Sequence, residues 1–382
     1  MQSIQSNGKR EIIYSSLVRC VEFNDSFNLF RDEQPLSEGD VVAVEVEDAV
    51  GYAVGAGLLA SSLVEDRDGA LRVLSPGACL ITVVGSREST FWSVANLDAR
   101  RGSPMQLVSH AGLCSYLISG SAKAINVRVL GRVAQSGGTA VNIKSHSVSL
   151  PRAGSARRRR TMVFAGTSAE VGKTTSMLHV MRKLREAQPA SSILAIKLSG
   201  TPSQAEINLY RSYGATSVLN LVDLGFPSSY TTDKRLLLER VDEMIASDMF
   251  QAADHVMIEL GGDVIGGTND DLAQLISRRT AATIVLSAFD CFGAEGCVRF
   301  LDALGVRVAA ISGKCTANSV VKKRTHDLCG VPALSVFDLQ DLEQLTGLCM
   351  GLENMVAAEG GAAATGLAAK SQGSRTAGRQ PA

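Results

Sequence analysis

The sequence predicts an α/β protein in two parts: a β-rich, barrel- or sandwich-like N-terminal domain, and a C-terminal domain with a mostly parallel, doubly wound sheet. From residue 161 onward, continuous runs of Val, Ile, Leu and Ala alternate with helical patterns, as expected when helices cover both faces of a parallel sheet. Between residues 11 and 149, short strand candidates are separated by Gly, Ser or Asn clusters, a pattern that favours a barrel or sandwich.

Composition indicates where these parts begin and end. A chain of 382 residues can bury two cores. We expect the β-rich domain at 1–149, a linker rich in Pro, Gly and Arg at 150–160, and the second domain at 161–357. The segment 358–382 is rich in Gly, Ala and Ser and lacks aromatic residues, so we expect a disordered tail.

Composition also narrows the class of partner. Lys+Arg (38) and Asp+Glu (38) balance, so no global charge favours nucleic acid or an anionic membrane. No apolar run reaches the length of a membrane span, and the N-terminus is too polar for a signal peptide. The eight cysteines form no C-x-x-C pair, which suits a reduced, cytoplasmic protein. We expect a small-molecule substrate such as an amino acid or a carboxylic acid, and a homo-oligomer, most simply a dimer.

The first domain offers strand candidates but no evident chemistry. Segments 36–44 and 74–84 share a shape, a turn with glycine followed by a β-branched run. Further strands are expected at 12–23, 113–118, 125–133 and 140–143. Arg87 and Glu88 follow the strand that ends at Val84, and we favour a solvated loop there over a ligand contact.

The second domain alternates strands and helices throughout. Strands are predicted at 162–165, 193–197, 217–222, 255–259, 282–288, 306–312 and 333–336. Helices are predicted at 173–187, 203–213, 232–246, 270–279, 295–304, 317–329 and 339–350. Ligands of doubly wound sheets bind beyond the carboxyl ends of the strands, so functional residues should follow each strand.

The first strand of this domain runs into a loop that suits phosphate, and a helix follows. The residues concerned are Gly166, Thr167, Ser168, Ala169, Glu170, Val171, Gly172, Lys173, Thr174 and Thr175. Their spacing, G-x5-G-K-T-T, departs from the usual P-loop, G-x4-G-K-[ST], because Thr167 stands where glycine is usual. Backbone N–H groups and the helix N-terminus would bind nucleotide phosphates along this whole stretch. Lys173 would reach the outer phosphates, and the Thr174 hydroxyl would hold Mg²⁺.

The end of the second strand carries a lysine beside small polar residues. Lys197 is followed closely by Ser199 and Gly200. A lysine there adds positive charge where negative charge develops during phosphoryl transfer or holds a substrate carboxylate, so Lys197 is a catalytic candidate. Ser199 and Gly200 are candidates for substrate contacts.

A buried acid ends the strand at 255–259. The order of an apolar run, Glu259, and then Gly261, Gly262 and Asp263 is a Walker B arrangement. A carboxylate at the end of a core strand would be costly without a cation or hydrogen bonds, so we expect Glu259 to bind Mg²⁺ and to act in catalysis. The two glycines would let the backbone approach substrate, and Asp263 would contact substrate or the metal.

Two other strand ends carry less specific signals. Asp223 follows the third strand, where it would either ligate Mg²⁺ or cap the next turn, and the sequence leaves both open. Lys314 and Asn318 follow the strand at 306–312, a position that often packs against the purine base in P-loop proteins. Both are candidates for base contacts.

These motifs resemble those of dethiobiotin synthetase and its relatives in the SIMIBI class of P-loop NTPases. Gly166-Thr-Ser-Ala-Glu-Val-Gly-Lys-Thr174 is similar to their loop, Gly-Thr-Asp-x-x-Val-Gly-Lys-Thr. Lys197-Leu-Ser-Gly-Thr201 resembles their Lys-Pro-x-x-Ser/Thr-Gly segment, and Glu259 falls where they carry the acid of Val-Glu-Gly-Ala-Gly-Gly. The resemblance spans 161–336 and implies an ATP- and Mg²⁺-dependent enzyme that activates a carboxylate or carbamate to form an amide or ring.

A second resemblance concerns the overall layout. Asp223-Leu-Gly-Phe-Pro-Ser-Ser-Tyr230 and Ile258-Glu-Leu-Gly-Gly-Asp263 are similar to segments of a two-domain P-loop family that includes a D-glutamate N-acetyltransferase. Members of that family usually carry a different N-terminal half. This resemblance implies small amino acids or acids as substrates, and an acyl-CoA donor whose phosphates Lys173 would hold without hydrolysis.

Three functions therefore stand as hypotheses. The favoured one is an ATP-dependent ligase acting through phosphorylation. The second is a small-molecule kinase or an acyl-CoA-dependent N-acyltransferase, and the third is a nucleotide-gated regulatory protein whose barrel recognises a partner. Their reactions can be told apart. A ligase releases ADP and free phosphate, a kinase gives ADP and a phosphorylated product, and an acyltransferase releases free CoA. A nucleotide-gated regulatory protein would show very slow hydrolysis that only a protein partner stimulates.

Overall fold

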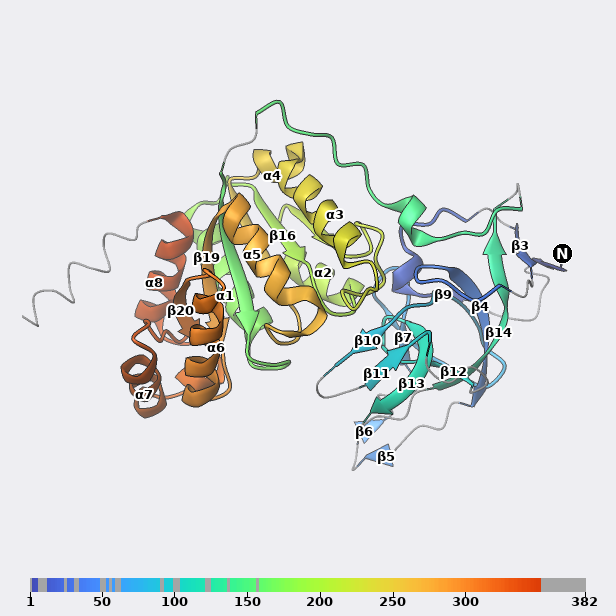
Figure 1. Ribbon diagram of the computed structural model, residues 1–382, viewed down its shortest axis with the longest axis horizontal. Helices are drawn as coiled ribbons and strands as arrows, with labels where there is room; N and C mark the ends of the chain where they lie inside the picture. Colours follow the sequence, from blue (N-terminus) through green and yellow to red (C-terminus); the bar gives the residue numbers. More distant parts are fainter. Residues whose placement is uncertain are drawn as a thin grey trace, which may run out of the picture.

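The computed structural model describes residues 2–5, 12–23, 26–30, 34–48, 53–54, 57–58, 63–89, 93–98, 104–120, 125–135, 138–155 and 158–351. Within these residues the chain forms a β-rich domain followed by an α/β domain (Figure 1). The expected tail at 358–382 lies outside the described residues. None of the described helices combines the length and the apolarity needed to span a bilayer.

The second domain is built on a six-stranded parallel sheet in the order β17-β16-β18-β15-β19-β20. Its strands are β15 (Arg160–Gly166), β16 (Ile193–Lys197), β17 (Ser217–Asn220), β18 (His255–Glu259), β19 (Ala281–Ser287) and β20 (Val308–Ser312). The helices are α1 (Lys173–Ala187), α2 (Gln204–Ser212), α3 (Lys234–Ala246), α4 (Asp248–Ala252), α5 (Asn269–Arg279), α6 (Cys291–Ala303), α7 (Ser319–Cys329) and α8 (Leu339–Met350). The predicted doubly wound α/β class is confirmed.

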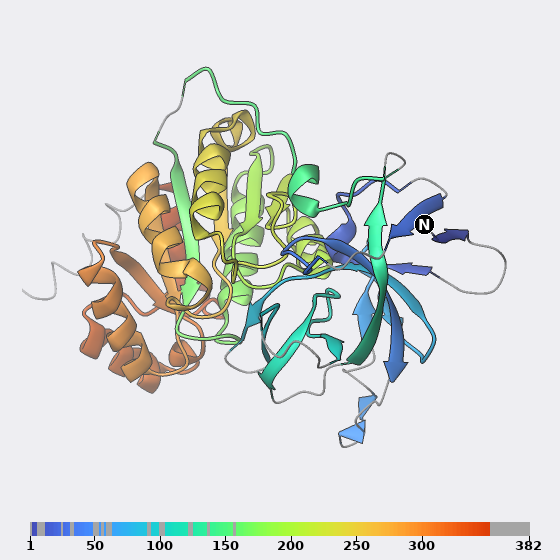
Figure 2. The ribbon, with the colours of Figure 1, turned by 45° about the vertical axis from the view of Figure 1, so that its right-hand side comes forward.

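Helices cover both faces of this sheet, which is why its strands are apolar throughout (Figures 1 and 2). Strand β15 shows the alternation: Val163 and Ala165 pack with α3, α5 and α6. Met162 and Phe164 point the other way, to the core that α1, α2 and α8 complete. All of these side chains are at most 1% exposed, so β15 is a fully buried central strand that fixes the loop after it.

The predicted elements of this domain differ from the structure mainly at their ends. Helix α6 begins at Cys291 rather than at 295, because the Asp290 side chain caps it by accepting from the Gly293 N–H. The short helix α4 was not predicted. No strand forms at 333–336: only Ala333 bridges to Ile311, and Pro332 precedes it.

The first domain holds one ten-stranded, mostly antiparallel sheet in which β10-β11-β13-β12-β14-β4-β9-β2 run side by side, with β3 beside β14 and β1 beside β3. Its strands are β1 (Gln2–Gln5), β2 (Ile12–Tyr14), β3 (Ser26–Phe30), β4 (Val41–Asp48), β9 (Cys79–Val83), β10 (Arg87–Glu88), β11 (Ser93–Asn96), β12 (Met105–Leu107), β13 (Cys114–Gly120) and β14 (Ile125–Ala134). Two separate hairpins are β5 (Ala53–Val54) with β6 (Gly57–Leu58), and β7 (Leu63–Glu65) with β8 (Leu71–Val73).

This sheet curls back on itself like a barrel. Val84, just after β9, bridges Cys114 at the start of β13, so strands from opposite parts of the sheet meet. Two predicted strands differ. The segment 12–23 is a strand only to Tyr14, and the 3₁₀ helix η1 (Ser16–Val18) then carries Leu17 and Val18 into the core. At 140–143 only isolated bridges form, from Ala140 to Ala134 and from Asn142 to Asp40, and η2 (Ile143–His146) begins behind an Asn142 cap.

The two domains pack together on the side of α2 and α3 (Figures 1 and 2), where the loops that follow β16 and β17 contact the first domain. Val222, which follows β17, is 1% exposed and belongs to the core of the first domain. Arg19 forms an ion pair with Asp223 at 2.5 Å, and the Val148 N–H donates to the Asp223 carbonyl at 2.8 Å. The β-rich domain therefore lies over the side of the sheet where ligands bind.

Candidate nucleotide site

The loop after β15 has the curled backbone that a phosphate cradle needs. Glu170 and Gly172 adopt left-handed conformations, with φ of 61° and 111°. A Cβ on Gly166 would lie 2.9 Å from the Cδ of Lys173, so only glycine fits where the loop folds back. Helix α1 has no side-chain cap, and its first N–H groups are the donors that a phosphate would use.

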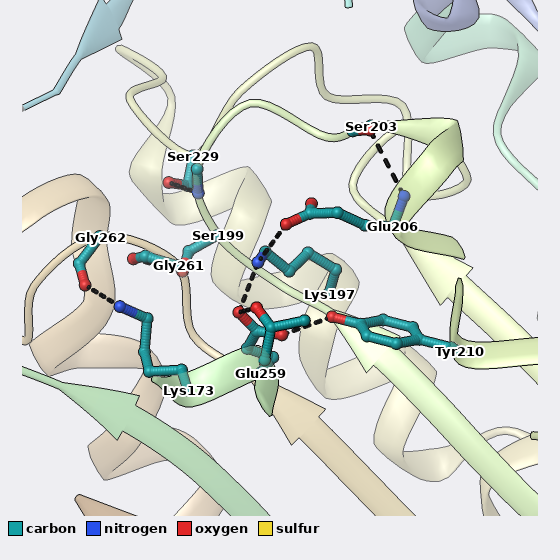
Figure 3. A network of polar contacts seen from close by, with 12 residues as sticks. Lys173, Lys197, Ser199, Ser203, Glu206, Tyr210, Ser229, Glu259, Gly261 and Gly262 are labelled. Atoms are coloured by element: carbon teal, nitrogen blue, oxygen red, sulfur yellow. Dashed lines mark hydrogen bonds and ion pairs between the residues drawn. The ribbon is translucent and has the colours of Figure 1, made fainter. Parts of the chain in front are cut away.

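The P-loop lysine points into this cradle. Lys173 is 5% exposed, and its Nζ donates to the Ser168 carbonyl at 2.6 Å. The same Nζ donates to the Gly262 carbonyl at 2.7 Å (Figure 3). Burial and the nearby Lys197 ammonium lower its pKa to about 8. Its hydrogen-bond partners are neutral carbonyls, so phosphate oxygens are stronger acceptors that would replace them.

A buried carboxylate lies beside the start of α1 on the neighbouring strand β18. Glu259 is 1% exposed, and its two oxygens accept hydrogen bonds from three side chains (Figure 3). The donors are the Thr174 hydroxyl at 2.8 Å, the Lys197 ammonium at 2.6 Å and the Tyr210 hydroxyl at 2.6 Å. Burial alone would raise the pKa of Glu259, but Lys197 and these hydrogen bonds lower it below its ordinary value. Glu259 is therefore a hydrogen-bonded carboxylate in the core with Thr174 beside it, whereas Mg²⁺ binding and a catalytic role stay predictions.

Helix α2 supplies two residues that the sequence did not single out. Glu206 accepts from Lys197 at 3.0 Å, and Tyr210 stands one helical turn further on, over Glu259. Burial would lower the pKa of Lys197, but the two carboxylates raise it above its ordinary value, so the ammonium stays charged. The spacing of an acid and a tyrosine four residues apart, beside the buried Ile207, was the available signal.

The loop after β16 is hydrogen-bonded to the loop after β18 and to the loop after β17. The Ser199 hydroxyl donates to the Gly261 carbonyl at 3.1 Å, and the Gly200 N–H donates to the Ser229 hydroxyl at 3.0 Å. A Cβ on Gly261 would lie 2.6 Å from the Ser199 carbonyl oxygen. Glycine is thus required at position 261 because the loops after β16 and β18 lie in close contact there. Substrate contacts of Ser199, Gly200, Gly261 and Gly262 stay predictions.

Asp263 shapes the turn that leads to η3 (Gly266–Thr268). Its Oδ1 accepts from the N–H groups of Ile265 at 3.0 Å and Gly266 at 2.7 Å. Asn269, 1% exposed, donates to the Gly261 and Asp263 carbonyls, and its own Oδ1 is buried without a partner among the described residues. That orphaned acceptor marks this loop as a place where a polar ligand would fit.

Of the two roles expected for Asp223, metal ligand or turn cap, its contacts in the structure match the turn cap. Its Oδ2 accepts from the Asn220 N–H at 2.7 Å, and Arg19 of the first domain neutralises it. These contacts hold the two domains together, and we do not include Asp223 in the proposed metal site.

Lys314 and Asn318 lie on the segment that packs against the P-loop. The Lys314 N–H donates to the Val171 carbonyl at 3.3 Å, and its Nζ lies 4.9 Å from the centre of the Phe289 ring. The Asn318 side-chain oxygen is occupied, because it caps α7 by accepting from two backbone N–H groups. Base contacts by these residues stay predictions.

The donor set also indicates how a metal would be held. Among the described residues, no group of three His, Cys, Asp or Glu side chains converges on one point. A divalent cation here would need phosphate oxygens of a nucleotide together with the Thr174 hydroxyl, and Glu259 would balance its charge. This is the arrangement that Mg²⁺, which keeps several water ligands, prefers beside nucleotides.

Fold and site together give the C-terminal domain the architecture of the P-loop NTPase fold: a parallel sheet, a curled loop before an uncapped helix, a buried lysine, and an acid on the adjacent strand. The β-rich domain precedes it as a separate sheet.

Comparison with known proteins finds only distant structural likenesses. No family model matches the chain, and no curated protein is significantly similar to it. Solved structures similar to it include a ParA-family ATPase from Chlorobium tepidum TLS (14% identity, 51% of this chain and 90% of that one, TM-score 0.31). A second is a DUF1611-family protein from Anabaena variabilis (13% identity, 57% of this chain and 65% of that one, TM-score 0.36). A third is the signal recognition particle receptor FtsY from Elizabethkingia anophelis (16% identity, 51% of this chain and 67% of that one, TM-score 0.31). At these scores the likenesses carry no argument about activity.

Proposed function

We propose that the protein binds ATP with Mg²⁺ between the P-loop and Glu259 and transfers the terminal phosphoryl group to a small carboxylate or carbamate, which then closes an amide or ring. The observation that carries this proposal is the buried Glu259, bonded at once to Thr174 and Lys197 beside an uncapped helix N-terminus. The resemblance of the three motifs to dethiobiotin synthetase supports the same chemistry.

Each residue has a defined task in this proposal. Lys173 would exchange its two carbonyl partners for phosphate oxygens, and the N–H groups at the start of α1 would hold the same phosphates. Lys197 is held by two carboxylates at the edge of the site, so its charge is in place before negative charge develops. Bound Mg²⁺ would neutralise charge on the phosphates. Catalysis would come from positioning and electrostatics, because no side chain needs to form a covalent bond.

Changing Lys173 to Ala tests the site directly. It removes the phosphate contact, so we expect nucleotide affinity to fall by at least about tenfold and turnover to be lost. Fluorescence titration with a labelled ADP, with and without Mg²⁺, measures the affinity. A matched control is Lys183→Ala, which alters the same helix away from the nucleotide loop, where the 29%-exposed Lys183 pairs with Glu343 of α8. Equal nucleotide binding by Lys173→Ala and the wild type would refute the proposed site.

Product analysis decides among the reactions. Incubation with ATP and a panel of small carboxylic and amino acids should release ADP and free phosphate with a condensed product. ADP with a stable phosphorylated product would instead identify a kinase. Release of free CoA from an acyl-CoA, without ATP cleavage, would identify an acyltransferase, in which Lys173 holds the donor's phosphates.

A further inference from the structure

A carboxylate of the first domain holds the start of α2 in the second domain. Glu65, the last residue of β7, is 2% exposed although its side chain ends in a carboxyl group. Its carboxylate accepts from the Ser203 hydroxyl at 2.8 Å, the Gln204 N–H at 2.8 Å and the Ala205 N–H at 2.6 Å. These are the leading donors of the helix, and a negative charge at a helix N-terminus is favourable.

The same helix carries the residues that organise Lys197 and Glu259. Glu206 is the residue after Ala205, the last of the three that Glu65 contacts, and Tyr210 lies one helical turn further along α2. Figure 3 shows both side chains directed at the Lys197–Glu259 pair. A continuous series of hydrogen bonds therefore runs from the first domain, through α2, to the acid beside Thr174.

We propose that Glu65 is a positioning residue for the nucleotide site: the N-terminal domain, through this carboxylate, fixes α2 so that Glu206 and Tyr210 hold Lys197 and Glu259 in working geometry. The inference rests on the proposed function, since it gives the first domain a part in phosphoryl transfer. Glu65 touches no reacting group itself.

Helix α2 needs such support because it is short. Nine residues form an isolated helix poorly, so its position depends on what holds its two ends. Its own cap is weak, because the Ser203 hydroxyl accepts from the Glu206 N–H at 3.4 Å. Glu65 meets the donors that this cap leaves unpaired, and only the first domain supplies it.

The test compares two carboxylates that both cross the domain boundary. In Glu65→Gln the amide nitrogen faces a backbone N–H donor, so at least one of the three contacts is lost. The matched control is Glu38→Gln, because Glu38 bonds the Thr231 hydroxyl at 2.7 Å and the Thr232 N–H at 3.3 Å, before α3 and away from α2. Glu65→Asp, which keeps the charge but shortens the reach, is a milder variant should Glu65→Gln fail to fold.

The expected result is a split between turnover and binding. Glu65→Gln should lower kcat for ATP cleavage by about tenfold and leave labelled-ADP affinity within about threefold of wild type, whereas Glu38→Gln should change neither. Hydrogen exchange of the amides at 204–212 should quicken in Glu65→Gln alone. Combining Glu65→Gln with Tyr210→Phe should lower kcat no further than the stronger single change, because both act through one contact.

Three results would overturn the inference: equal exchange at 204–212 in both Gln variants, equal loss of kcat in both, or fully multiplicative effects of the Glu65 and Tyr210 changes. Its failure is distinct from failure of the proposed function. Wild-type protein that binds no nucleotide would end the proposed function, whereas the exchange measurement reports on Glu65 and α2 without any nucleotide.

Discussion

The balance of charge around Glu259 is the central feature at the scale of single residues. An ionised carboxylate with 1% exposure would be costly unless each of its oxygens were hydrogen-bonded. Lys197 supplies the counter-charge, Tyr210 a second donor, and Thr174 links the pair to the start of α1. The Glu259 carboxylate is thus held in place by donors that are already oriented toward it, so this arrangement does not have to form when a nucleotide binds.

Replacing Tyr210 by Phe tests how far this balance depends on the hydroxyl. The ring remains, but Glu259 loses one donor and a buried acceptor is left short of partners. We expect the free energy of unfolding to fall by about 1–3 kcal/mol, the cost of an unsatisfied buried polar group. Urea unfolding measures it, with Tyr213→Phe, at the C-cap of the same helix, as the control. A change below about 0.5 kcal/mol would show that Tyr210 contributes only packing.

The segment after β20 supports the P-loop at the scale of secondary-structure elements. Gly313 has φ of 93°, and a Cβ added to it would lie 2.3 Å from the Val171 carbonyl oxygen and 3.1 Å from the Ala288 backbone. The Lys314 N–H donates to the same Val171 carbonyl. The curl of the nucleotide loop therefore depends on close backbone contact with an element far along the chain.

Gly313→Ala should disturb this contact. Gly330→Ala is a matched control, since Gly330 also has a left-handed backbone, with φ of 65°, but a Cβ there meets nothing within 4 Å. Both changes carry the strain of a left-handed alanine, about 1 kcal/mol. Gly313→Ala should cost at least about 1 kcal/mol more and also weaken labelled-ADP binding. Equal effects of the two variants on stability and on binding would contradict the supporting role of Gly313.

Contacts between the domains matter at the scale of the whole molecule. Among the residues that the structure describes, three carboxylates cross the boundary: Glu38, Glu65 and Asp223. Each meets hydroxyl, backbone or guanidinium donors of the other domain, and Val222 inserts into the first domain's core. The carboxyl-end loops of the parallel sheet are therefore shaped by both domains.

A double-mutant cycle on Arg19→Met and Asp223→Asn tests whether this boundary is energetically coupled. The two side chains are only 14% and 13% exposed, so removing one partner leaves the other as a largely buried, unpaired charge. Each single change should therefore lower the free energy of unfolding by more than half as much as the double change does. We expect a coupling of at least about 1 kcal/mol in unfolding free energy. The exposed pair Arg182–Glu186 is the control, where coupling should stay below about 0.5 kcal/mol. A change in Mg²⁺ requirement with Asp223→Asn would instead restore Asp223 as a metal ligand.

Local pattern determined much of this protein. The strand–loop–helix order predicted β15 and α1, and the ends of α1, β16, β18 and α8 fall at the predicted residues. Lys173, Thr174, Lys197 and Glu259 were all expected at strand or helix ends, and the structure brings them together. Such predictions succeed because a motif's spacing and a strand's apolar run are encoded in neighbouring residues.

Only the tertiary structure decided which distant groups complete the site. Tyr210 contacts Glu259, which lies 49 residues away along the chain, and Glu65 contacts Ser203, which lies 138 residues away. No local spacing in the sequence could therefore predict either contact. The same holds for Asp223, whose sequence position fitted a metal ligand or a turn cap equally well until Arg19 was found beside it. The sequence by itself determined the two fold classes and the phosphate loop, because those follow from local periodicity and backbone geometry. The packing of one domain on the other decided the support of the site, because a buried charge is stabilised by whichever donors the fold brings to it.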